Sequence, residues 1–356
     1  MTRFKKFAKR AAKIIALVLL LLVLLAGSLF IWIRSEPREV TECEAGFRLI
    51  ENASGADCVP ENASKILLNS TSVNQFFIAV DQPSAMMVGV LDYFTAADIP
   101  GLYSRLREVN EGVIDLGTVQ GGAAQNLELL LEVDPDVIIT EFDLGDLVKP
   151  AETIAPVIIL THLDTWKEMT LFAGDLIGEQ AEAERLLAEY DARVEILRAQ
   201  FDDPSEITIS NVRIFQDLAR VQLPASFSGQ IIRDVGFSFP EEQLALIEET
   251  PDLYEIRVSD ERIDLIDADY LFLYGGLPDW TFETNLETTS SSVVDTFRSD
   301  PLFQFLDAED ANTVHEVDIY WAATGIYSAH AVLDDLFRHV AGVDPEEVAP
   351  NPLRLE

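Results

Sequence analysis

Basic residues are scarce in this sequence. Its 356 residues include 25 Lys and Arg against 62 Asp and Glu, which gives a net charge of −37 at neutral pH. Residues 1–38 hold eight of the basic residues and one Glu, a local charge of +7, so the rest of the chain carries −44. A surface of this sign repels nucleic acid and anionic lipid. The composition therefore argues against DNA or RNA as a partner.

Histidine is rare too, and familiar catalytic motifs are missing from the sequence. The four histidines are His162, His315, His330 and His339, and none has a neighbour at the spacing of a metal site or a catalytic triad. No glycine pattern matches a P-loop or a dinucleotide-binding fingerprint. We therefore expect no catalytic residues, no bound metal and no cofactor.

Cysteine occurs twice, at Cys43 and Cys58, in a stretch rich in Asn, Ser and Gly. No histidine cluster accompanies the pair, which argues against zinc. We expect a disulfide that closes a small loop outside the cytoplasm. Two unrelated free thiols are the alternative.

The N-terminus combines a basic segment with an uncharged apolar run. Met1–Lys13 is basic, and Ile14–Ile33 has no charge and is long enough to span a bilayer. Basic residues before the span place the N-terminus in the cytoplasm and the bulk of the chain outside. A cleavable signal peptide is the alternative. Leu25–Ser28 resembles a lipoprotein signal, but Ser28 stands where the lipidated cysteine belongs, so we expect a single-pass, uncleaved anchor.

Beyond the anchor, short β-branched runs alternate with helical patterns, which is typical of parallel βαβ units. A longer helix is predicted over Gln180–Phe201, where apolar residues recur at steps of three and four. It would measure roughly 33 Å. Similar sequence on both sides of it favours two Rossmann-like α/β lobes joined by a long rigid helix. A single α/β domain is the alternative.

This organisation divides the chain into five segments. They are a basic tail and transmembrane anchor (1–34), a tether with the cysteine loop (35–64), an N-terminal lobe (65–163), the linking helix (164–203) and a C-terminal lobe (204–356).

Ligands of such sheets bind at the carboxyl ends of the strands. In the N-terminal lobe these ends carry the candidate ligand-binding residues Ser70, Tyr93, Gln120 and Phe142. In the C-terminal lobe the candidates are Arg213, Arg220, Phe227, Tyr274, Trp280, Tyr320 and Trp321, with Arg220 and Phe227 expected in a long loop over residues 216–228.

Aromatic rings and arginines carry most of this prediction. Trp280, Tyr320 and Trp321 are expected in loops after strands, where a large ring suits a flat or conjugated ligand. Partial burial under a loop is the alternative for each ring. Arg213 and Arg220 stand out in so acidic a chain and suit an anionic ligand, although either could instead be a surface counter-ion to Asp217.

Three runs of the sequence resemble the solute-binding proteins of ABC importers for iron-siderophore complexes, haem and cobalamin. The runs are Asn126–Ile139, which contains NLE followed by VDPDVII; Ser226–Phe237, which ends in DVGF; and Val258–Tyr270, which contains VSDE and DADY. The resemblance extends over roughly residues 65–340.

The resemblance implies a ligand held in a cleft between the lobes, no catalysis, and delivery to an ABC permease. It also implies one acidic residue on each lobe that docks onto the permease, here Glu261 and, in a departure from the family's Glu, Asp146. We expect a monomer that captures a ferric siderophore. Haem or cobalamin binding, a membrane-anchored α/β hydrolase and a scaffold without ligand are the alternatives.

Overall fold

The computed structural model describes residues 42–53, 55–83, 85–86, 102–109, 127–141, 148–161, 163, 165–215, 219–258, 260–275 and 290–354. The predicted anchor over residues 1–34 lies outside these ranges. Within them, no helix combines the length and the apolar character needed to cross a membrane.

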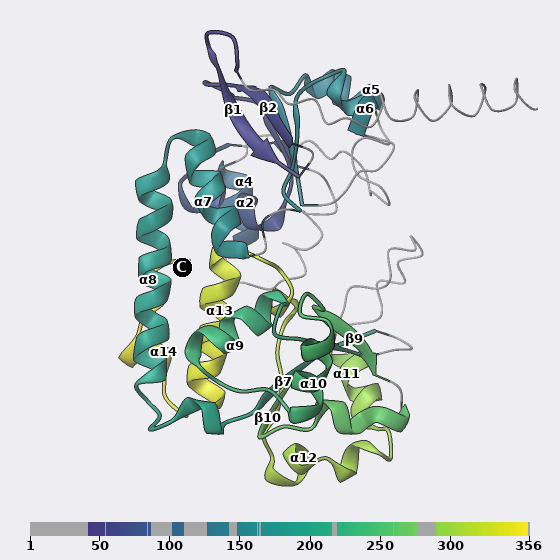
Figure 1. Cartoon of the computed structure of the whole chain (residues 1–356). Coiled ribbons are helices and arrows are strands. Elements are labelled where there is room, and N and C mark those ends of the chain that lie inside the picture. The colour runs from purple at the N-terminus through teal and green to yellow at the C-terminus, as the bar shows by residue number, and fades with distance from the viewer. Residues whose placement is uncertain are drawn as a thin grey trace, which may run out of the picture.

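Two β-sheets divide the described chain into two α/β units, which we call the N-lobe and the C-lobe (Figure 1). In the N-lobe a four-stranded sheet has the order β4-β3-β5-β6, with every pair parallel. The elements up to the end of this sheet are β1 Phe47–Asn52, β2 Gly55–Pro60, β3 Ile66–Asn69, α2 Thr71–Ala79, β4 Ala85–Met86, α4 Leu102–Val109, α5 Leu127–Val133, β5 Val137–Thr140, α6 Val148–Glu152 and β6 Val157–Ile159.

The strands of the N-lobe sheet lie where the apolar runs predict them. β3, β5 and β6 are almost entirely Ile, Leu and Val, and their side chains are buried on both faces. Continuous apolar strands of this kind belong to parallel sheets covered on both sides. The antiparallel hairpin β1–β2 precedes the sheet, and the predicted disulfide between Cys43 and Cys58 joins β2 to the segment before β1.

The C-lobe sheet has five strands in the order β11-β10-β7-β8-β9. Its elements are η3 Pro204–Glu206, β7 Ile209–Ile214, β8 Ala219–Gln222, α9 Phe227–Val235, α10 Glu241–Glu249, β9 Glu255–Val258, η4 Asp260–Ile266, β10 Tyr270–Gly275, α11 Ser290–Arg298, η5 Phe303–Phe305, α12 Asp307–Ala311, β11 Val314–Glu316, η6 Ile319–Trp321, α13 Ile326–His339 and α14 Pro345–Val348.

This second sheet corrects two expectations. β8 pairs antiparallel with both β7 and β9, so the sheet is mixed rather than wholly parallel. The expected loop over residues 216–228 contains β8 and the first two residues of α9. β8 is a four-residue strand with only Ala219 and Val221 facing the apolar core. Two apolar residues are too few for a periodic pattern, and the strand is held by its hydrogen-bonded neighbours.

Helices α7, Trp166–Ile177, and α8, Gln180–Arg198, form an antiparallel pair beside the lobes. A capping box between Thr165 and Glu168 starts α7, and Gly178 ends it in the left-handed conformation. The helices approach closely at Gly174, where an added Cβ would lie 2.6 Å from the Cβ of Ala183. α8 ends three residues before the predicted end and runs alongside both lobes (Figure 1).

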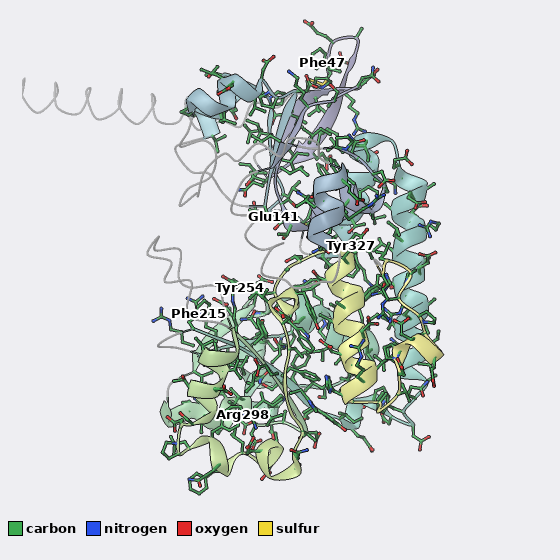
Figure 2. The ribbon with its side chains drawn as sticks, turned by 180° about the vertical axis from the view of Figure 1, so that it is seen from behind. Phe47, Glu141, Phe215, Tyr254, Arg298 and Tyr327 are labelled. Atoms are coloured by element: carbon green, nitrogen blue, oxygen red, sulfur yellow. A yellow bond between two sulfur atoms is a disulfide. The ribbon has the colours of Figure 1, made fainter. Side chains whose placement is uncertain are left out.

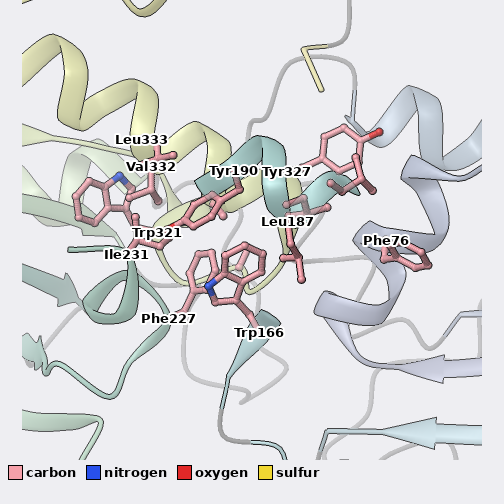
Figure 3. Close-up of a cluster of buried hydrophobic side chains, with 14 of the residues drawn as sticks. Phe76, Trp166, Leu187, Tyr190, Phe227, Ile231, Trp321, Tyr327, Val332 and Leu333 are labelled. Carbon is pink, nitrogen blue, oxygen red and sulfur yellow. The ribbon is translucent and has the colours of Figure 1, made fainter. Parts of the chain in front are cut away.

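The lobes share one hydrophobic core. A continuous buried cluster extends from N-lobe residues such as Phe76 to C-lobe residues such as Phe272. In the middle of it, Trp166 of α7 packs edge-on against Tyr190 of α8 and Phe227 of α9, with ring centroids 4.9 and 6.2 Å from the indole (Figure 3). The connection between the lobes is therefore a packed core, in addition to a linking helix.

Candidate functional site

Three arginines lie in one row across the C-lobe sheet. Arg213 of β7 is directly opposite Arg220 of β8, which is directly opposite Arg257 of the edge strand β9. Residues opposite each other in neighbouring strands point to the same face, and like charges in such positions destabilise the sheet. A row of three cations in a chain of net charge −37 therefore requires a compensating interaction.

An aromatic ring sits beneath the first two members of this arginine row. The guanidinium carbons of Arg213 and Arg220 each lie 4.9 Å from the ring centre of Phe215. Phe215 immediately follows β7, and Figure 2 places it on the side of the C-lobe that faces the N-lobe. Cation–π contacts of this kind hold the two guanidinium groups side by side.

Among the described side chains, the acidic residue Glu255 is built into the same surface. Glu255 is directly opposite Gln222 and accepts hydrogen bonds from Arg220 and from Gln222, the second at 3.1 Å. Its side chain is 15% exposed, and that of Arg220 is 27% exposed. Next to it, Tyr254 is 58% exposed and also lies on the side facing the N-lobe (Figure 2).

The facing edge of the N-lobe carries Glu141, directly after β5 (Figure 2). The hydroxyl of Ser70 donates to this carboxylate, and the backbone N–H of Ser72 donates to it at 3.1 Å. Burial raises the pKa of Glu141, while these hydrogen bonds act in the opposite direction. The N-lobe edge therefore presents a carboxyl group that is more easily protonated than a surface glutamate.

Ser70, a predicted ligand-binding residue, uses its hydroxyl within the protein. It is 1% exposed, donates to Glu141 and accepts from the backbone N–H of Val73 as the N-cap of α2. A serine before a helix is a common cap, and this role explains its position at the end of β3.

Three predicted ligand-binding rings are instead core residues. Trp321 is fully buried, stacks on Phe272 at 4.5 Å and donates from Nε1 to Asp335 at 2.8 Å. Phe227 packs on Trp166, and Tyr274 is fully buried in the shared core. The structure places all three rings in the core, and their contact with a ligand stays a prediction.

The physical reason lies in the local backbone. Trp321 ends the 3-10 turn η6, which packs against α13 and β10 and brings the indole onto Phe272. Tyr320, in the same turn, is half-buried and donates its hydroxyl to Asp335 at 2.7 Å. The two aromatic residues share one carboxylate acceptor.

Several predicted residues lie outside the described side chains. Tyr93, Gln120, Phe142, Trp280 and Asp146 belong to undescribed segments, and the backbone of Glu261 lies in η4 without a described side chain. Their roles remain predictions. Of the described candidates, Arg213 and Arg220 are brought together, and Phe215, Tyr254, Glu255 and Arg257 join them without having been anticipated.

One signal for the missed residues exists in the sequence. Glu255–Val258 alternates charged and apolar residues, which is typical of an exposed edge strand. The two charged positions of this strand, which follow Tyr254 in the sequence, could have identified Glu255 and Arg257 as surface candidates. Their alignment with Arg220 depends on strand register, which the sequence does not specify for so short a strand.

A hydrolase would need a histidine as a base beside its nucleophile, and the described histidine His315 packs among other rings. The ring of His315 stacks on that of His339, with centroids 4.2 Å apart, and lies against Phe272. Burial, followed by the neighbouring His339, lowers the pKa of His315 to about 4. His162 lies outside the described residues.

Sequence relatives share most of this chain. It is 26% identical over 295 residues to the probable siderophore-binding lipoprotein YfiY of Bacillus subtilis (strain 168), covering 81% of this chain and 86% of the relative. It is 27% identical over 299 residues to the achromobactin-binding periplasmic protein of Dickeya dadantii (strain 3937), covering 80% of this chain and 90% of the relative.

Solved structures share the fold. Staphylococcus aureus SirA complexed with staphyloferrin B matches with a TM-score of 0.66 at 19% identity, covering 82% of this chain and 98% of that chain. Bacillus subtilis FeuA complexed with ferri-bacillibactin matches with a TM-score of 0.63 at 16% identity, covering 83% and 98%. The family profile described as "Periplasmic binding protein" matches residues 103–318, more than half of the sequence. The chain therefore belongs to the periplasmic binding protein family.

Proposed function

We propose that this protein is the extracytoplasmic binding component of an ABC importer, which captures a ferric siderophore between its lobes and delivers it to the permease. It is a transport protein and not an enzyme, and the iron chelate is its cargo. The names of matched relatives support this proposal, because they refer to siderophore binding or iron uptake, and two of them name achromobactin and staphyloferrin B.

The arginine row is the observation that carries this proposal. Ferric siderophores bind iron through negatively charged oxygen atoms, and many of their complexes are anions. Arg213, Arg220 and Arg257 concentrate positive charge on the face of one sheet, and arginine is the side chain best suited to pair with carboxylate or phenolate oxygens. An anionic ligand would offset the repulsion between the three cations.

The ligand would also contact the aromatic residues beside the arginine row. Phe215 and Tyr254 face the N-lobe, and Glu141 lies across from them (Figure 2). An aromatic surface next to cations suits a chelate with flat conjugated groups. This arrangement replaces Trp321, Phe227 and Tyr274 as the proposed aromatic contacts, while Tyr93, Phe142, Trp280 and Gln120 stay in the proposal.

We extend the proposal to membrane anchoring and permease docking. Residues 14–33 would anchor the uncleaved chain in the membrane, and the five segments would have the bounds given in the sequence analysis. The anchor would raise the local concentration of the protein at the permease. Retention of the full-length chain in membranes after alkaline carbonate extraction tests this anchor, and release into the supernatant contradicts it. Glu261 and Asp146 would dock onto the permease.

Titration of the purified full-length protein tests the proposed function. Ferric complexes of staphyloferrin B, achromobactin, bacillibactin and ferrichrome, with haemin and cobalamin for the alternative cargoes, would be followed by isothermal titration calorimetry. We expect saturable binding of at least one ferric siderophore at micromolar or lower concentration. Absence of binding to all four ferric complexes contradicts the proposal.

The Arg257→Ala variant tests the site. Arg257 is exposed on the edge strand, so its loss should leave the fold intact. Because a charge-assisted hydrogen bond contributes ~1.5–3 kcal/mol, we expect the dissociation constant to rise by about tenfold or more. Arg233→Ala removes the same charge from an exposed position on α9 and should change binding by less than about twofold. Equal effects of both variants would remove the arginine row from the site.

A further inference from the structure

The arginine row carries its own carboxylate. Glu255 and Arg220 form a salt bridge in which the glutamate side chain is only 15% exposed. The second oxygen of Glu255 accepts from Nε2 of Gln222 at 3.1 Å. Both oxygens are therefore used, and the carboxylate is held in place by two neighbours on β8.

This fixed carboxylate changes the charge that a ligand meets. Glu255 lies on the same face as the arginine row and removes one unit of positive charge from it through its pairing with Arg220. A ligand oxygen that approaches Arg220 must also approach Glu255, which repels it. Because both groups are largely shielded from water, this repulsion is screened less than that between surface charges.

If Glu255 served only to orient Arg220, Arg220 would have no other contact that orients it. Arg220 is already oriented by the ring of Phe215, 4.9 Å from its guanidinium carbon. Gln222 is buried and lies directly opposite Glu255 in the sheet register. Arg220 thus has a second orienting contact that does not depend on the carboxylate.

We propose that Glu255 is a specificity-determining residue that limits the negative charge of the chelate accepted by the arginine row. The inference rests on the proposed function and deepens it, because it names the ligand class. The row would favour less anionic ferric chelates over a ferric triscatecholate, in which three catecholate dianions around Fe³⁺ leave an overall charge of −3 by simple addition.

The test compares Glu255→Gln with the wild type in the full-length protein. The probes are ferri-bacillibactin, a trianionic triscatecholate complex, and ferrichrome, whose three hydroxamates leave the ferric complex neutral. We expect Glu255→Gln to strengthen ferri-bacillibactin binding by about tenfold and to steepen its salt dependence. Ferrichrome binding should change by less than about twofold, because a neutral complex has little net interaction with the removed charge.

Two further variants make the result specific. Glu132→Gln removes the same charge from an exposed position on α5 and should leave ferri-bacillibactin binding unchanged. Glu255→Asp keeps the charge and should retain the wild-type discrimination, with circular dichroism to verify folding.

The possible failures are distinguishable. If Glu255→Gln weakens ferri-bacillibactin binding or leaves it unchanged while the wild type binds a ferric siderophore, Glu255 only positions Arg220, and this inference alone is overturned. If neither protein binds any of the ferric complexes, the proposed function is overturned together with it.

Discussion

Asp335 illustrates how single residues of this protein are constrained by burial. It is 5% exposed and accepts hydrogen bonds from Trp321 and Tyr320, with Arg338 at 3.3 Å. Burial is the largest influence on this carboxyl group and raises its pKa from 3.8 to about 6, against these hydrogen bonds and the arginine. The group that fixes the two aromatic residues is therefore costly to ionise.

This shift predicts a pH dependence of stability with a defined sign. Because the folded-state pKa of Asp335 is above its unfolded value, its protonation stabilises the fold fully below pH ~4, and this contribution is lost as the pH rises through ~6. In thermal melts, Asp335→Asn should therefore lose less stability relative to the wild type at pH 7 than at pH 4.5. A difference that is constant over this range, or that grows toward pH 7, contradicts the assigned shift.

Scarcity made two residues stand out in the sequence. Arg213 and Arg220 were singled out because basic residues are few, and the structure places both in the arginine row, while their contact with a ligand stays a prediction. The full burial of Trp321 was not predictable, because a ring after a strand can turn either toward a ligand or back onto the sheet. Its orientation depends on the η6 turn and on Phe272, which is 49 positions earlier in the chain (321 − 272).

At the scale of elements, α2 of the N-lobe is joined to the start of α13 by one buried side chain. Nε2 of Gln75 donates to the carbonyl of Ala323 at 3.2 Å and to the hydroxyl of Ser328 at 2.8 Å. Its Oε1 accepts from the backbone N–H of Ser328 at 3.0 Å. Gly325, at φ +145°, has no room for a side chain, because an added Cβ would lie 2.5 Å from the carboxamide carbon of Gln75.

These contacts predict coupled effects on stability. Gln75→Leu leaves buried partners unsatisfied and should lower the free energy of unfolding by about 2–4 kcal/mol. Gly325→Ala should lower the free energy of unfolding by ~1–3 kcal/mol through backbone strain. The clash between its Cβ and the side chain of Gln75 should lower it further. A Gln75→Ala background removes the two carboxamide contacts, at 2.5 and 2.6 Å, and keeps only the contact with the Cβ at position 75, at 2.9 Å. Because the clash is reduced, the two substitutions should be non-additive in urea unfolding.

Gly178→Ala provides the matched control for that cycle. Gly178 also has a positive φ, of +76°, but no described residue beyond its chain neighbours and its own helix backbone has an atom within 4 Å of its added Cβ. Its substitution should therefore cost backbone strain that adds independently to Gln75→Ala. Additive behaviour of Gly325→Ala would mean that Gln75 does not restrict the start of α13.

Elements were predictable in proportion to their length and periodicity. The periodic apolar stripe located α8 to within three residues, and β3, β5 and β6 were located by uninterrupted apolar runs. β8 and β9 have four residues each and follow no strong pattern. Contacts such as Gln75–Ser328, 253 residues apart, depend on the assembled fold and leave no local signal.

At the scale of the whole molecule, two α/β units share a core and face each other across surfaces of different chemistry. The C-lobe side presents arginines and aromatic rings, and the N-lobe side presents Glu141 (Figure 2). The long helix and the alternating pattern predicted this division. The shared core around Trp166 was not predictable, because it combines residues from α7, α8 and α9.

We propose that a ferric siderophore binds between the lobes against the arginine row. A crystal structure of the full-length protein with the ferric siderophore that binds tightest in calorimetry would locate the ligand. We expect the chelate within hydrogen-bond distance of at least two of Arg213, Arg220 and Arg257, with Phe215 or Tyr254 against it and the N-lobe edge near Glu141 on its other side. A chelate bound away from the arginine row, with these side chains arranged as in the unliganded protein, would contradict it.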